Sequence, residues 1–268
     1  MKLLFFLVSR VAHIATVRSI ASNFPASQNK NLIIIGEFSG IKKALIAARI
    51  DVMWSTVITN KSLTAYLRGF DSWQTEIFIY TDFGLQINYY LHTLSNKNII
   101  HIFQDGSASY TPLTRKFSIL NYIYSLLMGD GFKYENFVGQ SRYTSTLYLY
   151  DIDRFREKFG DRSRQIKIKH INPSFLQSIS TLADKSYIEE YSYNSTNTAD
   201  TAVIYLPGWT LKPLLLDYVK KNFEGMIFIK AHPADKNLQI NFENITSISS
   251  HYVAEQVIAE LLSKFKDL

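Results

Sequence analysis

The chain has 268 residues, of which 47% are hydrophobic and 19% are charged. This composition is typical of a globular protein with one large or two modest domains. The chain contains no cysteine, which excludes a disulfide framework and thiolate metal sites and favours a reducing cytoplasm. The formal net charge of +6 would suit a nucleic acid, an anionic membrane surface or a phosphate-bearing ligand.

The basic residues are scattered along the chain and form no recognisable nucleic-acid-binding module. Their densest stretch runs from Arg154 to His170 and is diluted by Glu157 and Asp161. We therefore expect a solvated helix and loop there, with a membrane-surface patch as the alternative. No nucleic-acid partner is expected.

The N-terminus carries a short apolar run, Leu3–Val8, which superficially resembles a signal peptide. The run is too short for that role, and Arg10 and His13 follow it. We interpret it as a buried first strand that enters a helix. No segment reaches the roughly 20 apolar residues needed to span a bilayer. The expected location is the cytoplasm, with peripheral contact at the inner face of the cytoplasmic membrane as an option.

Short apolar runs rich in β-forming residues alternate with longer helix-like stretches. This pattern is typical of a parallel sheet with crossover helices. In chain order, the expected strands are Leu3–Val8, Leu32–Ile35, Ile77–Ile79, Ile99–Phe103, Val203–Leu206 and Met226–Ile229. The expected helices are His13–Ser22, Ser39–Ala48, Leu85–Leu94 and Leu211–Asn222.

A polar, turn-rich stretch from Tyr187 to Asp200 precedes a fresh strand and marks the expected domain boundary. We predict a first domain over residues 1–198 and a second over residues 199–268. The second is short for a complete nucleotide-binding half, so we expect it to be incomplete or truncated.

The strand Ile99–Phe103 runs directly into Gln104, Asp105, Gly106 and Ser107. This order places a carboxylate at the carboxyl end of a parallel strand, where open α/β sheets bind ligands. Gly106 permits a sharp turn, and Ser107 can hydrogen-bond locally or to a ligand. An ordinary strand-ending Asp-Gly turn is the alternative.

The strand Met226–Ile229 similarly delivers Lys230, His232 and Pro233 at its end. Pro233 prevents continuation into the sheet and holds His232 in an extended conformation. A histidine in that place can act as an acid or as a phosphate ligand. A histidine that merely caps a strand or helix is the alternative.

Together, these strand ends resemble the acidic-acidic-Gly and HP motifs of bacterial GT-B sialyltransferases and polysialyltransferases. The segment Leu4–Ser22 resembles the opening strand and helix of these enzymes, in which a polar loop ends the first strand near the acceptor. The resemblance implies an α/β, GT-B-like fold with two Rossmann-like domains facing across a cleft. It also implies inverting, metal-independent transfer of sialic acid from CMP-sialic acid, without a cofactor, to a glycan such as lipooligosaccharide or capsule.

On this resemblance, Asp105 would be the general base that acts on the acceptor hydroxyl, and His232 would assist departure of the CMP phosphate. The helix that contains Glu255 resembles the family helix whose glutamate meets the donor ribose. The expected donor contacts are Glu255, Pro233, Lys230, Gly106 and Ser107, and the expected acceptor contacts are Trp209, Tyr110 and Asp82.

The sequence departs from the family pattern at two places. Gln104 occupies the first position of the motif, where the family normally has another acid. If that acid were the base, the activity of this chain would be weakened or lost. If Asp105 suffices, burial would raise its basicity. The chain stops at Leu268, before the Ser- or Thr-rich loop that grips the donor phosphate in the family, and Lys230 and Lys212 are candidates for that contact.

Other interpretations stay open. They are a GT-B transferase that uses another nucleotide sugar, and an inactive or truncated relative that only binds CMP or a glycan. Asp151 and Asp153 match the DxD of metal-dependent transferases, but a helix start with acids in its first turn is favoured. The histidines show no paired ligand spacing, so we expect no bound metal. No glycine-rich phosphate loop occurs, so a P-loop or dinucleotide-binding enzyme is not expected.

Overall fold

The computed structural model describes residues 2–38, 41–105, 109–110, 112–114, 118–127, 135–160, 166–172, 202–206, 213–223, 225–230, 245–248, 257–258 and 261. The chain divides into two compact units, Met1–Phe175 and Leu176–Leu268. The predicted boundary between residues 198 and 199 lies outside the described residues.

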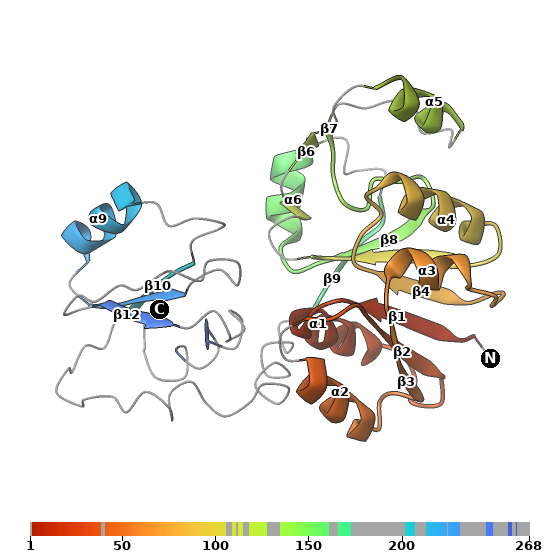
Figure 1. The fold of residues 1–268 in the computed structure, drawn as a ribbon, viewed down its shortest axis with the longest axis horizontal. Helices are drawn as coiled ribbons and strands as arrows, with labels where there is room; N and C mark the ends of the chain where they lie inside the picture. Colours follow the sequence, from red (N-terminus) through yellow and green to blue (C-terminus); the bar gives the residue numbers. More distant parts are fainter. Residues whose placement is uncertain are drawn as a thin grey trace. The chain divides into compact units, whose positions relative to one another are not determined.

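The first unit is built on a seven-stranded sheet with the order β3-β2-β1-β4-β5-β8-β9 (Figure 1). All neighbouring strands in it are parallel. The strands are β1 (Leu4–Val8), β2 (Lys30–Ile35), β3 (Thr56–Asn60), β4 (Glu76–Ile79), β5 (Ile99–Phe103), β8 (Thr144–Leu149) and β9 (Ile168–His170). The structure confirms the predicted α/β class, with a Rossmann-like sheet in this unit.

Strand β1 lies between β2 and β4, so the order of the chain reverses between β1 and β4. Crossover connections leave such a switch point on opposite faces of the sheet, and a crevice opens outside the carboxyl ends of the two strands. The fold therefore indicates the carboxyl edge of β1 and β4 as the place where a ligand would bind.

Helices cover both faces of the sheet, with α1 and α2 on one side and α3 and α4 on the other (Figure 1). The helices of this unit are α1 (Val11–Ala21), α2 (Ile41–Ile50), α3 (Leu63–Arg68), α4 (Leu85–Ser95), α5 (Ile119–Leu127) and α6 (Ile152–Phe159). Between β5 and β8, the short strands β6 (Leu113–Thr114) and β7 (Glu135–Asn136) form a separate antiparallel pair.

The core explains why the strands read as continuous apolar runs, since strands covered on both faces must be apolar on both. On the face toward α3, α4 and α6, Ile79 and Ile102 belong to one buried cluster with Leu67, Leu91 and Phe155. On the opposite face, the rings of Phe6 and Phe78 stack with their centroids 4.5 Å apart. Trp54 packs edge-on against Phe6 at 5.4 Å.

The predicted strands and helices of this unit match observed elements, with shifted ends. Strands β3, β8 and β9 and helices α3 and α5 were not predicted. Strand β3 is an edge strand in which Thr56, Ile58 and Thr59 are exposed, so no apolar run marks it. Asp151 caps α6, its side chain accepting a hydrogen bond from Arg154 N at 2.9 Å, and Asp153 lies in the first turn. The favoured interpretation of these acids as a helix start is confirmed.

In the second unit, three parallel strands are described, in the order β10 (Ala202–Tyr205), β11 (Met226–Lys230) and β12 (Ile245–Ile248). Helix α9 (Pro213–Asn222) connects β10 and β11 in sequence and begins at a proline, which suits a first helical position. Both predicted strands of this unit are confirmed. Among the described residues, no helix combines the length and apolar character needed to cross a bilayer.

Candidate active site

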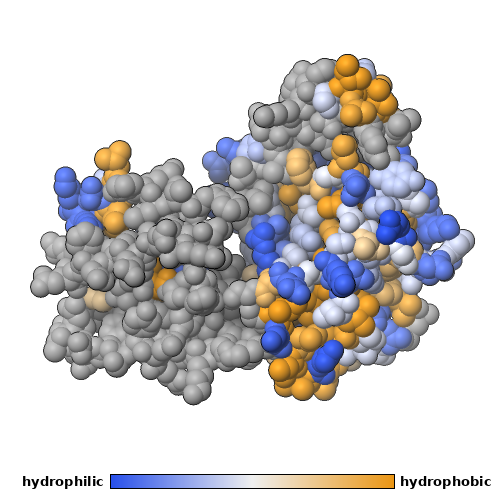
Figure 2. Space-filling view, in the orientation of Figure 1, coloured by the Kyte–Doolittle hydropathy of each residue, from blue (hydrophilic) through white to orange (hydrophobic). Residues whose placement is uncertain are grey.

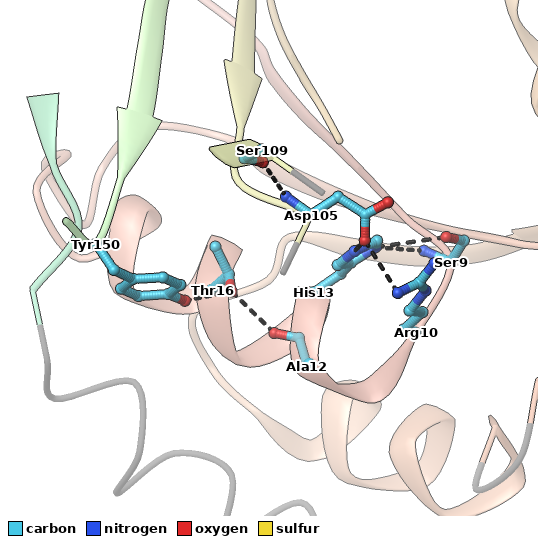
Figure 3. A network of polar contacts seen from close by, with 8 residues as sticks. All are labelled: Ser9, Arg10, Ala12, His13, Thr16, Asp105, Ser109 and Tyr150. Carbon is cyan, nitrogen blue, oxygen red and sulfur yellow. Dashed lines mark hydrogen bonds and ion pairs between the residues drawn. The ribbon is translucent and has the colours of Figure 1, made fainter. Parts of the chain in front are cut away.

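Polar side chains gather at the carboxyl edge of the sheet, beside the switch point. Ser9 and Arg10 follow β1, Tyr80 follows β4 and Asp105 follows β5. His13 reaches the same place from the first turn of α1 (Figure 3). This cluster brings together residues from three strands and one helix, and Asp105 is its only member that the sequence predicted to be in the site.

The centre of the cluster is a hydrogen bond between His13 Nε2 and Asp105 Oδ1, 2.9 Å long (Figure 3). The other ring nitrogen, Nδ1, accepts a hydrogen bond from the backbone N–H of Ser9 at 3.3 Å. An imidazole nitrogen that accepts from an N–H carries no proton, so the proton resides on Nε2. His13 therefore donates to the carboxylate.

The ring of His13 is held in place on all sides. It is only 3% exposed, it stacks on Tyr80 with centroids 4.8 Å apart, and it packs edge-on against Phe103 at 5.5 Å. A side chain so enclosed cannot itself reach a substrate. His13 acts on a ligand only through Asp105, which it orients.

Asp105 remains accessible, since its side chain is 18% exposed. Arg10, which is 62% exposed, places Nη1 3.1 Å from the same Oδ1 atom that His13 contacts. The backbone N–H of Asp105 donates to Ser109 Oγ at 3.0 Å, which fixes the turn. The second carboxylate oxygen, Oδ2, points away from the His13 ring and the Arg10 guanidinium and accepts no hydrogen bond from the described residues (Figure 3).

The electrostatics of the cluster keep Asp105 ionised. Burial raises the pKa of this carboxyl, but the hydrogen bond and electrostatic attraction of His13 and the charge of Arg10 lower it by more, so the pKa lies below its ordinary value. Burial raises the basicity of Asp105, as expected, but His13 and Arg10 outweigh this effect, so the carboxylate is less basic than an ordinary aspartate. Burial raises the pKa of Tyr80, and the nearby charge of Asp105 adds to that rise.

Gln104, the departure from the family pattern, points to the opposite face of the sheet, because successive side chains of a strand alternate. It is buried, and its Oε1 accepts hydrogen bonds from the Tyr110 hydroxyl at 2.5 Å and from Tyr150 N at 2.9 Å. Gln104 thus ties the end of β5 to the end of β8 and is not directed toward the cluster around Asp105.

Tyr110, a predicted acceptor contact, has its hydroxyl engaged in this same network. The hydroxyl accepts from Asp151 N at 2.9 Å, and burial raises the pKa of the phenol. The guanidinium of Arg154 lies over the ring, 5.4 Å from its centroid. The ring borders an open cavity of about 510 Å³, which is lined by Tyr110, Pro112, Arg154, Glu157 and Lys158.

Asp82, the other described acceptor candidate, has a structural role instead. It is 5% exposed, and its carboxylate accepts hydrogen bonds from Gly139 N, Ser141 N and Ser141 Oγ at 2.9, 3.1 and 2.5 Å. Burial raises its pKa, and these three hydrogen bonds oppose that rise. The carboxylate holds the turn before β8, so the expected contact with an acceptor is corrected to an internal support.

Lys230 is the one predicted donor contact that lies among the described residues. It is the last residue of β11, so it stands at the strand end as predicted, and its side chain is buried. Within the described part of the chain, no three His, Asp or Glu side chains gather in a way that would hold a metal ion. The remaining predicted site residues lie outside the described residues: Gly106, Ser107, Trp209, Lys212, His232, Pro233 and Glu255.

Comparison of the chain with models of known protein families finds no match, and comparison with curated proteins finds no significant relative. The functional argument therefore depends on the two motifs and on the geometry of the cluster around Asp105.

Proposed function

We propose that the protein is an inverting, metal-independent glycosyltransferase that moves sialic acid from CMP-sialic acid to a glycan hydroxyl, with Asp105 as the general base. The observation that carries the proposal is the state of this carboxylate. It lies at the carboxyl edge of a Rossmann-like sheet and is ionised, and His13 and Arg10 bind one of its oxygens while the other faces away from them. A general base needs this combination of charge, orientation and access.

In the proposed reaction, Asp105 Oδ2 takes the proton of an acceptor hydroxyl. The hydroxyl oxygen forms a bond to the anomeric carbon of sialic acid, and the bond from that carbon to the CMP phosphate oxygen breaks. CMP leaves with the electron pair, and the configuration at the anomeric carbon inverts. His232, which the motif resemblance assigns to the phosphate side, would stabilise the departing phosphate in a GT-B arrangement of the two units.

His13 and Arg10 support this chemistry in different ways. His13 fixes the orientation of the carboxylate, which is a prerequisite for an aligned proton transfer. Arg10 adds an exposed positive charge beside it, which offsets the repulsion between Asp105 and a donor that carries a phosphate and a carboxylate. The lowered pKa keeps Asp105 ionised at neutral pH, at the cost of weaker basicity.

Gln104 does not weigh against an active enzyme on this geometry. Its amide lies among Tyr110 and Tyr150 on the other face of the sheet, where a glutamate would be equally remote from Asp105. The proposal therefore assigns the base to the second position of the motif and a structural role to the first.

A donor panel tests the proposal. The full chain is incubated with a glycan acceptor and with CMP-sialic acid, UDP-sugars or GDP-sugars in parallel, with and without EDTA, and the released nucleotide is measured. We expect acceptor-dependent release of CMP that EDTA does not change. Turnover of a UDP- or GDP-sugar alone would reassign the donor. Loss of activity with EDTA and recovery with Mn²⁺ would refute the metal-independent mechanism.

Calorimetric titration with CMP separates an inactive relative from a wrong assignment. CMP binding without any turnover would identify a degenerate member that only binds the nucleotide. Absence of both binding and turnover would reject the sialyltransferase proposal as a whole.

A further inference from the structure

Helix α5 (Ile119–Leu127) exposes an unusually apolar surface. Its sequence, ILNYIYSLL, contains no charged residue. Five large side chains are 44–73% exposed, and at 100° per residue they lie within one arc of about 160°. Figure 2 shows them as a hydrophobic patch at the top of the first unit. We call this surface the α5 face: Ile119, Leu120, Tyr122, Ile123 and Leu126.

A second group of exposed apolar side chains, on α2, has a different character. Ile46 and Ile50 are exposed there, but Lys42 and Arg49 are exposed on the same side of the helix. Single apolar side chains between charges are common on protein surfaces and need no partner. The α5 face has no such charges within it, so water meets a continuous apolar surface.

Basic residues flank the α5 face in the sequence. Arg115 and Lys116 come just before the helix and Lys133 comes after it, while Asp130 is the only acid between Arg115 and Lys133. An uncharged apolar helix between cations matches the boundary of a bilayer with anionic headgroups, where a tyrosine such as Tyr122 is also favoured. The chain as a whole carries a net charge of +6.

The size of the helix limits what can cover it. Nine residues give a helix about 14 Å long, too short to cross a hydrocarbon core of about 30 Å. A second copy of the chain would need to bury about 800 Å² on each side, and a face of about 14 Å by 10 Å offers far less. A lipid surface needs no such area of complementary shape.

We propose that α5 lies in the plane of an anionic lipid bilayer, with the α5 face inserted at the boundary between headgroups and acyl chains. This proposal replaces the membrane contact that the stretch Arg154–His170 suggested. Helix α6 exposes Arg154, Arg156 and Lys158, but its large apolar side chains Phe155 and Phe159 are buried and cannot insert into a bilayer. The proposal does not depend on the donor. If the proposed function also holds, the acceptor glycan is presented at a membrane surface.

Vesicle flotation tests the proposal with two matched variants of the full chain. Ile123→Glu/Leu126→Glu alters the α5 face, and Ile50→Glu/Val52→Glu makes the same change at exposed apolar positions on and after α2. Vesicles contain either phosphatidylcholine alone or phosphatidylcholine with about 30% phosphatidylserine. Circular dichroism and sedimentation verify that each variant is folded and report its oligomeric state.

We expect the wild-type chain and the α2 variant to float with the anionic vesicles. Each lost aliphatic contact should weaken partitioning by about tenfold, so the α5 variant should remain with the unbound protein. Equal flotation of both variants, or no flotation of the wild type, would overturn the proposal. A wild-type dimer that only the α5 variant dissociates would assign the face to a second copy instead.

Discussion

Gln104 offers a prediction that distinguishes a structural residue from a lost catalytic acid. Its Oε1 accepts from the Tyr110 hydroxyl and from Tyr150 N, and both donors are inside the protein. Truncation to alanine would leave two donors unpaired, at about 1–3 kcal/mol each, so Gln104→Ala should lower the free energy of unfolding by about 2–6 kcal/mol. Denaturant titration monitored by fluorescence measures this difference.

Replacement by glutamate should behave quite differently. A carboxylate accepts the same two hydrogen bonds and strengthens them by its charge, which offsets much of the cost of burying that charge. We expect Gln104→Glu to change stability by less than about 2 kcal/mol. Its transfer rate should stay within about threefold of wild type, since the side chain points away from Asp105.

The double variant is the sharper comparison. Asp105→Asn should slow transfer by about 10²–10⁴-fold, and adding Gln104→Glu should restore none of that loss. Measured with CMP-sialic acid under saturating conditions, a double variant within tenfold of wild type would refute the assignment of the base to Asp105. Position 104 would then be the ancestral base.

Three further predictions follow from the buried contacts. Asp82→Asn should destabilise the protein by about 1–3 kcal/mol in denaturant titration, because an amide cannot accept all the donors that Gly139 and Ser141 present. Gly139→Ala should cost a similar amount, since the residue has φ of 89° and an added Cβ would lie 2.8 Å from a leucine methyl; unchanged stability would contradict the described turn. His13→Phe keeps the stacked ring but removes the hydrogen bond and electrostatic attraction that lower the pKa of Asp105, while the burial that raises this pKa remains. The acidic limb of the pH–rate profile should therefore move to higher pH in His13→Phe, whereas an unmoved limb would show that His13 does not act on this carboxylate.

Four of the seven strands of the sheet, β1, β2, β4 and β5, were predictable because they appear as apolar runs. In Leu32–Ile35 every residue is buried, and in Ile99–Phe103 every residue except Ile99 is buried. Edge strand β3 escaped because solvent reaches it and its side chains include Thr56 and Thr59. Strand β8 was also missed, although its last four residues are buried, because its first half is Thr144, Ser145 and Thr146. An apolar run therefore identifies a strand only where the buried side chains are themselves apolar.

The candidate site was predictable only in part, for a different reason. Asp105 was identified from its place at a strand end, but its partner His13 lies 92 residues earlier. Their contact depends on the strand order β1-β4-β5, which a single sequence does not specify. A histidine in the apolar segment after the first strand was the available signal, since a buried histidine needs a partner.

The orientation of Gln104 and the buried position of Asp82 were missed by the same kind of reasoning. Adjacency in sequence suggested that Gln104 and Asp105 share a site, although alternation along a strand directs their side chains to opposite faces. Asp82 follows β4 at the carboxyl edge of the sheet, but its carboxylate turns inward to the backbone of Gly139 and Ser141. Proximity to a sheet edge does not by itself expose a side chain.

The central claim is that Asp105 removes a proton during sialyl transfer, and the most direct test is the single-turnover rate of Asp105→Asn with bound CMP-sialic acid. Asp153→Asn, which alters an exposed aspartate in the first turn of α6, is the matched control. We predict a loss of about 10²–10⁴-fold for Asp105→Asn, with donor affinity largely kept and the control unchanged. A wild-type rate for Asp105→Asn would contradict the claim and leave Asp105 as a turn residue.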